Sequence, residues 1–263
     1  MSITFETPPA NTPATPATPA TPLEPPLVVV DMVWPDQSNH HGTLFGGAAL
    51  AMLDRIAFIM GSKSLRGTVV TAAVSPLDFT APAPAGHLVE SRASVVHRGR
   101  RSVTVETQLV AEDLLSGERI SCLTGKFVMV RQDAATLGVI TNDAPPPDVP
   151  GEGACAMVAE IVFPGHANHR GILHGGPAMA WMAKAGFVAA TRQSRRTVVM
   201  AGSEKLDFKA SAYVGDVVEV TARVARIGRR SIGVQVEMWA EAPSTGERRH
   251  CTSGRFTYVT IET

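Results

Sequence analysis

The chain has 263 residues, 44% of them hydrophobic, and its 24 basic and 24 acidic residues give a net charge of +0. This composition is typical of one or two globular domains and argues against a broad surface for nucleic acid. The longest apolar stretch, residues 44–60, contains Asp54 and Arg55, which argues against a membrane span. The N-terminus lacks the pattern of a signal peptide, and the three cysteines suit a reducing compartment, so we expect a cytoplasmic protein without disulfides.

Residues 1–26 form a tail rich in threonine, proline and alanine, with very little charge and few large apolar side chains. Such a segment buries too little apolar surface to offset the entropy lost on ordering. The composition therefore predicts a disordered, extended tail, to which we assign no function.

The next hundred residues predict a strand, a long helix and a series of further strands. The strand covers residues 27–34, and the helix runs from Gly46 to about Ser64 with apolar residues on every side of its first turns. Four strand-like runs follow, separated by proline and glycine, at 68–79, 87–97, 102–112 and 119–131. Because a helix that is apolar all round must be buried, we expect one antiparallel sheet to wrap completely round it.

The same pattern then recurs at a constant spacing of 129 positions. Asn39 and Gly46-Gly47 match Asn168 and Gly175-Gly176, and the register continues without a gap to Phe127 and Phe256. A repeat of this length predicts a duplicated domain rather than a solenoid. We place the first domain at 27–132, a linker rich in proline and glycine at 133–154, and the second domain at 155–263.

The second domain should contain a strand at 156–163, a helix at 177–193 and strands between 197 and 258. Pro177 is expected at the first helical position, where its missing N–H costs nothing.

Asp54 is a charged residue inside the apolar first helix. It lies about 10 Å from the helix start, too far for capping. A salt bridge or a solvent-facing position at a domain interface would explain it without any function. Alternatively, a carboxylate in a poorly hydrated cleft gains basicity and can serve as a general base or nucleophile.

Both helices are preceded by the same polar loop and the same pair of glycines. Asn39 and Asn168 could simply be turn residues, although the repetition favours a further role. The two glycine pairs could allow close helix–sheet packing. Alternatively, their unpaired N–H groups could hold an oxygen that develops negative charge in a reaction.

Arginines cluster at two equivalent strand turns. These basic positions and the serines that follow them are Arg98, Arg100, Arg101, Ser102, Arg226, Arg229, Arg230 and Ser231. Charged turns are often only solvated, but arginine is also well suited to phosphate.

These motifs together resemble the acyl-CoA thioesterases built from two hotdog domains in one chain. The resemblance covers about residues 27–131 and 156–261. It rests on Asn-His-x-Gly-x-x-x-Gly-Gly before a helix, on Asp54 seven residues later, on Asp-Phe in the next strand, and on Gly-Arg-x-Ser at the turn. It implies an α+β fold in which two tandem hotdog domains, each an antiparallel sheet wrapped round a long central helix, pack as an intrachain pseudo-dimer.

The resemblance also implies a site and a reaction, the hydrolysis of acyl-CoA to a free acid and coenzyme A. Carried over by position, the catalytic set joins Asp54 of one domain to Asn168, Gly175 and Gly176 of the other. The residues expected to bind coenzyme A are Arg98, Arg100, Arg101, Ser102, Arg229, Arg230, Ser231, Asn39, Gly46 and Gly47. No cofactor is expected, because coenzyme A is part of the substrate. The resemblance also implies a homo-oligomer, since related chains often assemble as trimers.

The duplication predicts one working site rather than two. The position in the second helix that matches Asp54 is Ala183, and the adjacent Lys184 matches Arg55. The second possible site, formed by Asn39, Gly46-Gly47 and Ala183, should therefore be inert, although it could still bind coenzyme A.

Two other functions are compatible with part of this pattern. Asp36 and His41 have the spacing of hotdog enoyl-CoA hydratases, but Gly165 and Arg170 replace them in the second unit. A non-catalytic acyl-CoA sensor would explain the lost acid. The histidines match no metal-ligand spacing, and the chain has no Gly-x-Ser-x-Gly motif, so we expect neither a metal site nor a serine hydrolase.

Overall fold

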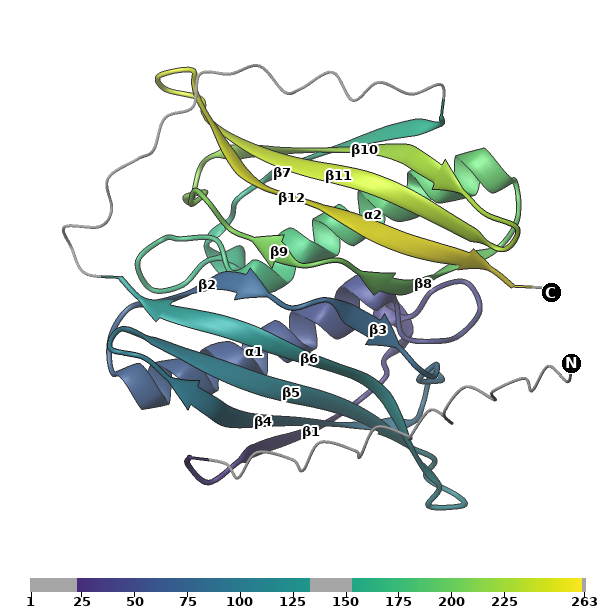
Figure 1. Cartoon of the computed structure of the whole chain (residues 1–263), viewed down its shortest axis with the longest axis horizontal. Helices are drawn as coiled ribbons and strands as arrows, with labels where there is room; N and C mark the ends of the chain where they lie inside the picture. The colour runs from purple at the N-terminus through teal and green to yellow at the C-terminus, as the bar shows by residue number, and fades with distance from the viewer. Residues whose placement is uncertain (1–22, 133–152, 262–263) are drawn as a thin grey trace, which may run out of the picture.

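The computed structural model describes residues 23–132 and 153–261 in two halves of like construction (Figure 1). Most of the predicted tail and linker, residues 1–22 and 133–152, therefore lies outside the described residues. The first half contains β1 (Leu27–Met32), a 3-10 turn (Pro35–Gln37), α1 (Gly46–Leu65), β2 (Val69–Val74), β3 (Leu77–Phe79), β4 (Leu88–Arg98), β5 (Ser102–Glu112) and β6 (Arg119–Arg131). The second contains β7 (Cys155–Ile161), a 3-10 turn (Pro164–His166), α2 (Gly175–Ser194), β8 (Val198–Ser203), β9 (Leu206–Asp207), β10 (Val217–Ile227), β11 (Ser231–Ala242) and β12 (Glu247–Thr260).

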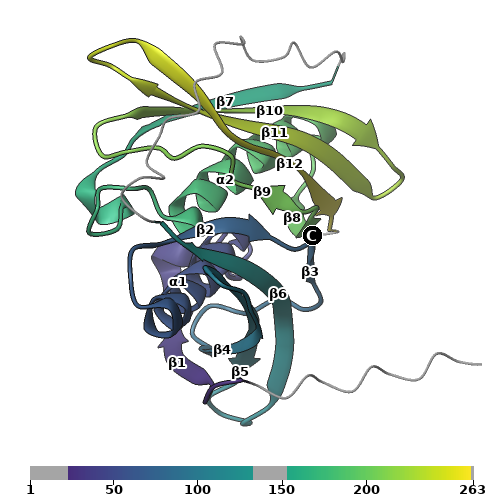
Figure 2. The same ribbon diagram turned by 60° about the vertical axis from the view of Figure 1, so that its left-hand side comes forward.

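The strands of both halves join into one antiparallel sheet. Its order is β1-β4-β5-β6-β3-β8-β12-β11-β10-β7, so the halves meet where β3 pairs with β8. A second junction pairs β2 with β9, at Ala73–Asp207 and Val74–Leu206. Within each half the sheet curves round its own helix, as Figure 2 shows from the side. The predicted tandem hotdog architecture is confirmed.

The two helices lie against each other on the same side of the joined sheet, behind its strands in the view of Figure 1. Their closest approach uses glycine: a Cβ on Gly47 would lie 3.0 Å from the Ala180 Cα, and one on Gly176 would lie 3.1 Å from the Ala51 Cα. The second helix therefore covers the part of the α1 surface that the sheet of the first half leaves open. Further along α1, Ile59 is 44% exposed.

Two local features differ from the pattern-based prediction. The strand expected over 68–79 is divided into β2 and β3, with Pro76 between them, since proline cannot donate a ladder hydrogen bond. The second helix begins at Gly175, so Pro177 is its third residue rather than its first. That position is still within the first turn, where the backbone N–H has no intrahelical partner.

Candidate active site between the two halves

Asp54 lies at the interface between the halves, where its side chain is 1% exposed. Its Oδ1 accepts a hydrogen bond of 2.6 Å from the Thr71 hydroxyl of β2. Its Oδ2 accepts one of 2.7 Å from the backbone N–H of Gly176, which belongs to the other half. No salt bridge to Arg55 forms among the described contacts, so the carboxylate is held by neutral donors from both halves.

Burial raises the pKa of Asp54 from an ordinary value of 3.8 to about 6, although the hydrogen bonds from Thr71 and Gly176 act in the opposite direction. Desolvation dominates because it removes the water that would stabilise the charged form. A carboxylate with a pKa near neutrality is largely ionised at pH 7 yet remains able to accept a proton.

The glycines at the start of α2 bring this carboxylate close to a cavity. Gly175 lines the cavity, and a Cβ there would lie 2.7 Å from Asp54 Oδ1 and 2.9 Å from the Thr71 side chain. Any other residue would therefore close the gap between the cavity and the acid. The helix start also provides backbone N–H groups without intrahelical partners, which suits a developing negative charge.

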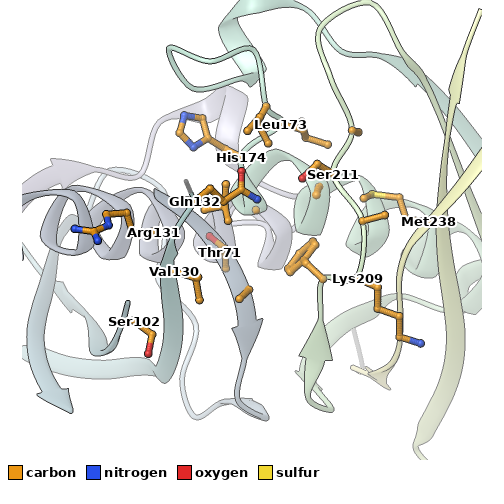
Figure 3. Close-up of a pocket in the computed structure, with 18 of the residues that line it drawn as sticks. Thr71, Ser102, Val130, Arg131, Gln132, Leu173, His174, Lys209, Ser211 and Met238 are labelled. Atoms are coloured by element: carbon orange, nitrogen blue, oxygen red, sulfur yellow. The ribbon is translucent and has the colours of Figure 1, made fainter. Parts of the chain in front are cut away.

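The cavity has a volume of about 490 Å³ and is lined by both halves, as the close-up in Figure 3 shows. Thr71, Val130 and Gln132 come from the first half, whereas Leu173 and His174 come from the loop before α2. His174 packs edge-to-face on Phe58, with ring centroids 4.5 Å apart. Burial and then Arg55 lower its pKa, which favours a neutral imidazole.

The two predicted asparagines hold the loops that precede the helices. Asn168 Oδ1 accepts hydrogen bonds from the N–H groups of Arg170 and Ile172, at 2.9 and 3.1 Å. Its amide also reaches across the interface, where Nδ2 donates to Val69 O at 3.5 Å. Asn39 organises its own loop in the same way through His41 and Thr43. The structure thus brings Asn168 to the strand that carries Thr71, without a direct hydrogen bond to Asp54.

The pseudo-symmetric position is built differently, and we call it the Ala183 site. Ala183 replaces the acid, and Met200 replaces Thr71, with its Sδ placed 2.8 Å from where a Cβ on Gly46 would be. Tyr258 donates a hydrogen bond of 2.7 Å to the Ala183 carbonyl oxygen from a fully buried position. Both the acid and its hydroxyl partner are therefore absent from this site.

The predicted phosphate-binding residues lie in several different environments. Arg101 and Ser102 line the cavity next to Asp54, together with Arg131, which the sequence did not single out. Arg98 instead bonds Ser64 and Glu24 near the end of α1. Arg230 lines a separate cavity, which is formed by residues of the second half and by His40 of the first. Arg100, Arg229 and Ser231 line neither of these two cavities, so their role stays a prediction.

Sequence reasoning missed Thr71, which the structure makes the first hydrogen-bond partner of the acid. The available signal was the difference between the repeats, because threonine in β2 corresponds to methionine in β8. Within residues 23–132 and 153–261, no three His, Cys, Asp or Glu side chains cluster as metal ligands. Over the same ranges, neither helix is long and apolar enough to cross a membrane.

Comparison with known proteins identifies the same family in both halves. The sequence matches the thioesterase superfamily over residues 41–118 and again over residues 170–247. Acyl-coenzyme A thioesterase 11 of Mus musculus is 27% identical over 276 residues, which cover 88% of this chain and 46% of the mouse protein. The chain thus spans about half the length of that relative.

Solved structures extend the comparison. An acyl-CoA hydrolase from Agrobacterium tumefaciens is 40% identical, with 90% of this chain and 96% of that protein covered and a TM-score of 0.41. A putative oleoyl thioesterase from Lactobacillus plantarum is 10% identical, with 91% of this chain and 98% of that protein covered. Its TM-score of 0.63 shows a shared fold.

Proposed function

The chain belongs to the thioesterase superfamily, and from this we propose that it hydrolyses acyl-CoA to a carboxylic acid and free coenzyme A, at one site between its halves. The observation that carries the proposal is the buried Asp54, held by Thr71 of its own half and Gly176 of the other beside a shared cavity. The names of the similar mouse and Agrobacterium proteins support the same reaction and substrate class.

In the proposed reaction, Asp54 acts as a general base. A water oxygen attacks the thioester carbonyl carbon while its proton passes to the carboxylate, and the carbonyl oxygen takes up negative charge. The Gly175 N–H and the Asn168 amide are proposed to stabilise that oxygen, while the Gly176 N–H holds the Asp54 carboxylate. The C–S bond then breaks, and the proton on Asp54 passes to the departing thiolate.

The test is an assay of thiol release from acyl-CoA, trapped with a chromogenic disulfide and repeated across acyl chain lengths. Release of one thiol per thioester consumed is expected. Binding without release would leave only the sensor hypothesis. Loss of the conjugated absorbance of an enoyl-CoA without thiol release would instead indicate a hydratase.

The rate should depend on pH through the ionisation of Asp54. Because the base must be deprotonated, kcat/KM is expected to rise about tenfold per pH unit below pH 6 and to level off above it. A profile from pH 4.5 to 8 on enzyme checked for folding at each pH measures this. A plateau that extends down to pH 4.5 would mean that a group of ordinary carboxylate pKa controls the rate.

Arg101 is proposed to contact a phosphate of coenzyme A at the cavity. Arg101→Ala should raise KM for acyl-CoA about tenfold or more and leave kcat nearly unchanged, because a charge-assisted hydrogen bond is lost from substrate and transition state alike. A short thioester without the nucleotide should be unaffected. Arg255→Ala is the matched control, since Arg255 pairs with Glu204 outside the cavity. An unchanged KM for acyl-CoA in Arg101→Ala would remove Arg101 from the phosphate site.

We further propose a cytoplasmic homo-oligomer, namely a trimer of these two-domain chains, with no resident cofactor. The edge strands support association, because Val30 of β1 is 58% exposed and Met157 of β7 is 66% exposed. All three cysteines, including the buried Cys122 and Cys251, are free thiols, which supports a reducing compartment. The domain boundaries at 27–132 and 155–263 remain part of the same proposal.

A further inference from the structure

The Ala183 site retains a cavity although it has lost its acid. This cavity has a volume of about 320 Å³ and lies between the halves at the position related by the repeat to the Asp54 cavity. Its lining is mainly apolar, and the side chains that define it include Phe45, Phe79, Phe187, Val198 and Met200. Asn39 and Gly46, which correspond to Asn168 and Gly175 in the repeat, line it as well.

A strongly basic cavity of about 920 Å³ adjoins this apolar one. The two cavities meet at Ile261, which lines both. The basic cavity is lined by His40 and by four arginines, namely Arg192, Arg195, Arg196 and Arg230. None of the described residues that line it is acidic. Arginine-lined cavities of this kind suit multiply charged phosphate groups.

Each of the two sites has an arginine at its opening, which we call the mouth, but the two arginines stand at different positions of the repeat. In the first half, Arg131 lines the Asp54 cavity, and its side chain passes Gly67, where a Cβ would lie 2.7 Å from Arg131 Cδ. The second half has Thr260 in place of Arg131 and Arg196 in place of Gly67. One arginine is lost and another gained at neighbouring positions of the same mouth.

The opposite end of the same site shows no such compensation. Asp54 and Thr71 correspond to Ala183 and Met200, and no described carboxylate lines the apolar cavity. The site thus keeps a basic mouth and an apolar interior but has no group to take a proton from water.

We propose that the Ala183 site is a second ligand site, which binds coenzyme A and its acyl thioesters without cleaving them. The arginines hold the phosphates, and the apolar cavity holds the acyl end. The choice of ligand rests on the proposed function, in which coenzyme A is the nucleotide that this chain recognises.

The test is the stoichiometry of coenzyme A binding to the full-length chain, measured by calorimetry. Coenzyme A has no thioester, so turnover does not interfere. Wild type should bind two molecules per chain. Arg196→Gly, which introduces the residue of the first half, should bind one, and Arg131→Thr, which introduces the residue of the second half, should also lose one. Circular dichroism and the thermal midpoint check that both variants fold.

Each outcome decides the proposal. One molecule per wild-type chain, lost in Arg131→Thr and retained in Arg196→Gly, would overturn it while leaving the catalytic site intact. Two molecules per chain in a protein that releases no thiol from acyl-CoA would support the second site and refute the thioesterase function.

The acyl end is tested separately in Arg131→Thr, with a non-hydrolysable thioether analogue of acyl-CoA. The analogue should bind this variant at least tenfold more tightly than coenzyme A, because burial of about two methylene groups already gives a tenfold gain in affinity. Equal affinities of the analogue, coenzyme A and ADP would overturn the assignment of the apolar cavity and show a site for the nucleotide only.

Discussion

Replacing Asp54 with asparagine is expected to lower kcat by about 10²–10⁴-fold, the usual loss when a general base is removed. The variant should keep the local structure. Its amide oxygen can accept from the Gly176 N–H, and its NH₂ can donate to the Thr71 hydroxyl, in place of the two bonds made by the carboxylate. Single-turnover measurements with saturating acyl-CoA would isolate the chemical step. Near-native turnover in a folded Asp54→Asn protein would refute the assignment of the base.

The same variant should be more stable than wild type above pH 6. The folded-state pKa of Asp54, about 6, lies above its ordinary value of 3.8, so the folded protein disfavours the charged form. Stability is therefore lost as the pH rises from about 4 to about 6, by about 3 kcal/mol in total. Asparagine does not ionise and avoids this cost. Urea titrations at pH 4 and pH 8 should show the difference between the two proteins mainly at pH 8.

The two asparagines should respond very differently to substitution. Asn168→Ala is expected to lower kcat by about 10²–10³-fold, as removal of one oxyanion donor does. Asn39→Ala should leave kcat close to wild type, because the cavity that Asn39 lines has Ala183 in place of the acid. The pair is well matched, since each side chain accepts two backbone hydrogen bonds within its own loop.

Loop destabilisation should thus be similar in both variants, and thermal midpoints measured beside kcat would separate it from catalysis. Equal losses of kcat in folded Asn39→Ala and Asn168→Ala proteins would mean that Asp54 works within its own half.

Much of the architecture could be predicted because the two halves of the sequence can be aligned with each other. The constant spacing of 129 positions defines two equal units, and the alternation of strands with one long apolar helix favours a curved sheet round a helix. Asp54 could be recognised from its depth in that helix, and its replacement by Ala183 follows from the spacing alone.

Other features depend on packing that no local pattern reveals. The close contact between the helices requires Gly47 and Gly176 to face Ala180 and Ala51, a geometry set by how the halves join. Thr71 resembles any other threonine in a strand until its hydroxyl is placed 2.6 Å from Asp54. Arg131 and Arg196 do not match in the repeat, and only the structure shows that each lies at the opening of one of the two related sites.

The pairing of the two halves within one chain also bears on how the protein can change. In an assembly of two identical subunits, every substitution occurs twice, so loss of the acid would inactivate both sites at once. Here Asp54 and Ala183 are encoded separately and lie on opposite sides of the same interface. The first half can therefore carry an ionisable group in its apolar helix, at a cost in stability that is incurred only once. The second half can contain Met200 and Tyr258 at the matching positions without loss of the acid that the first half provides.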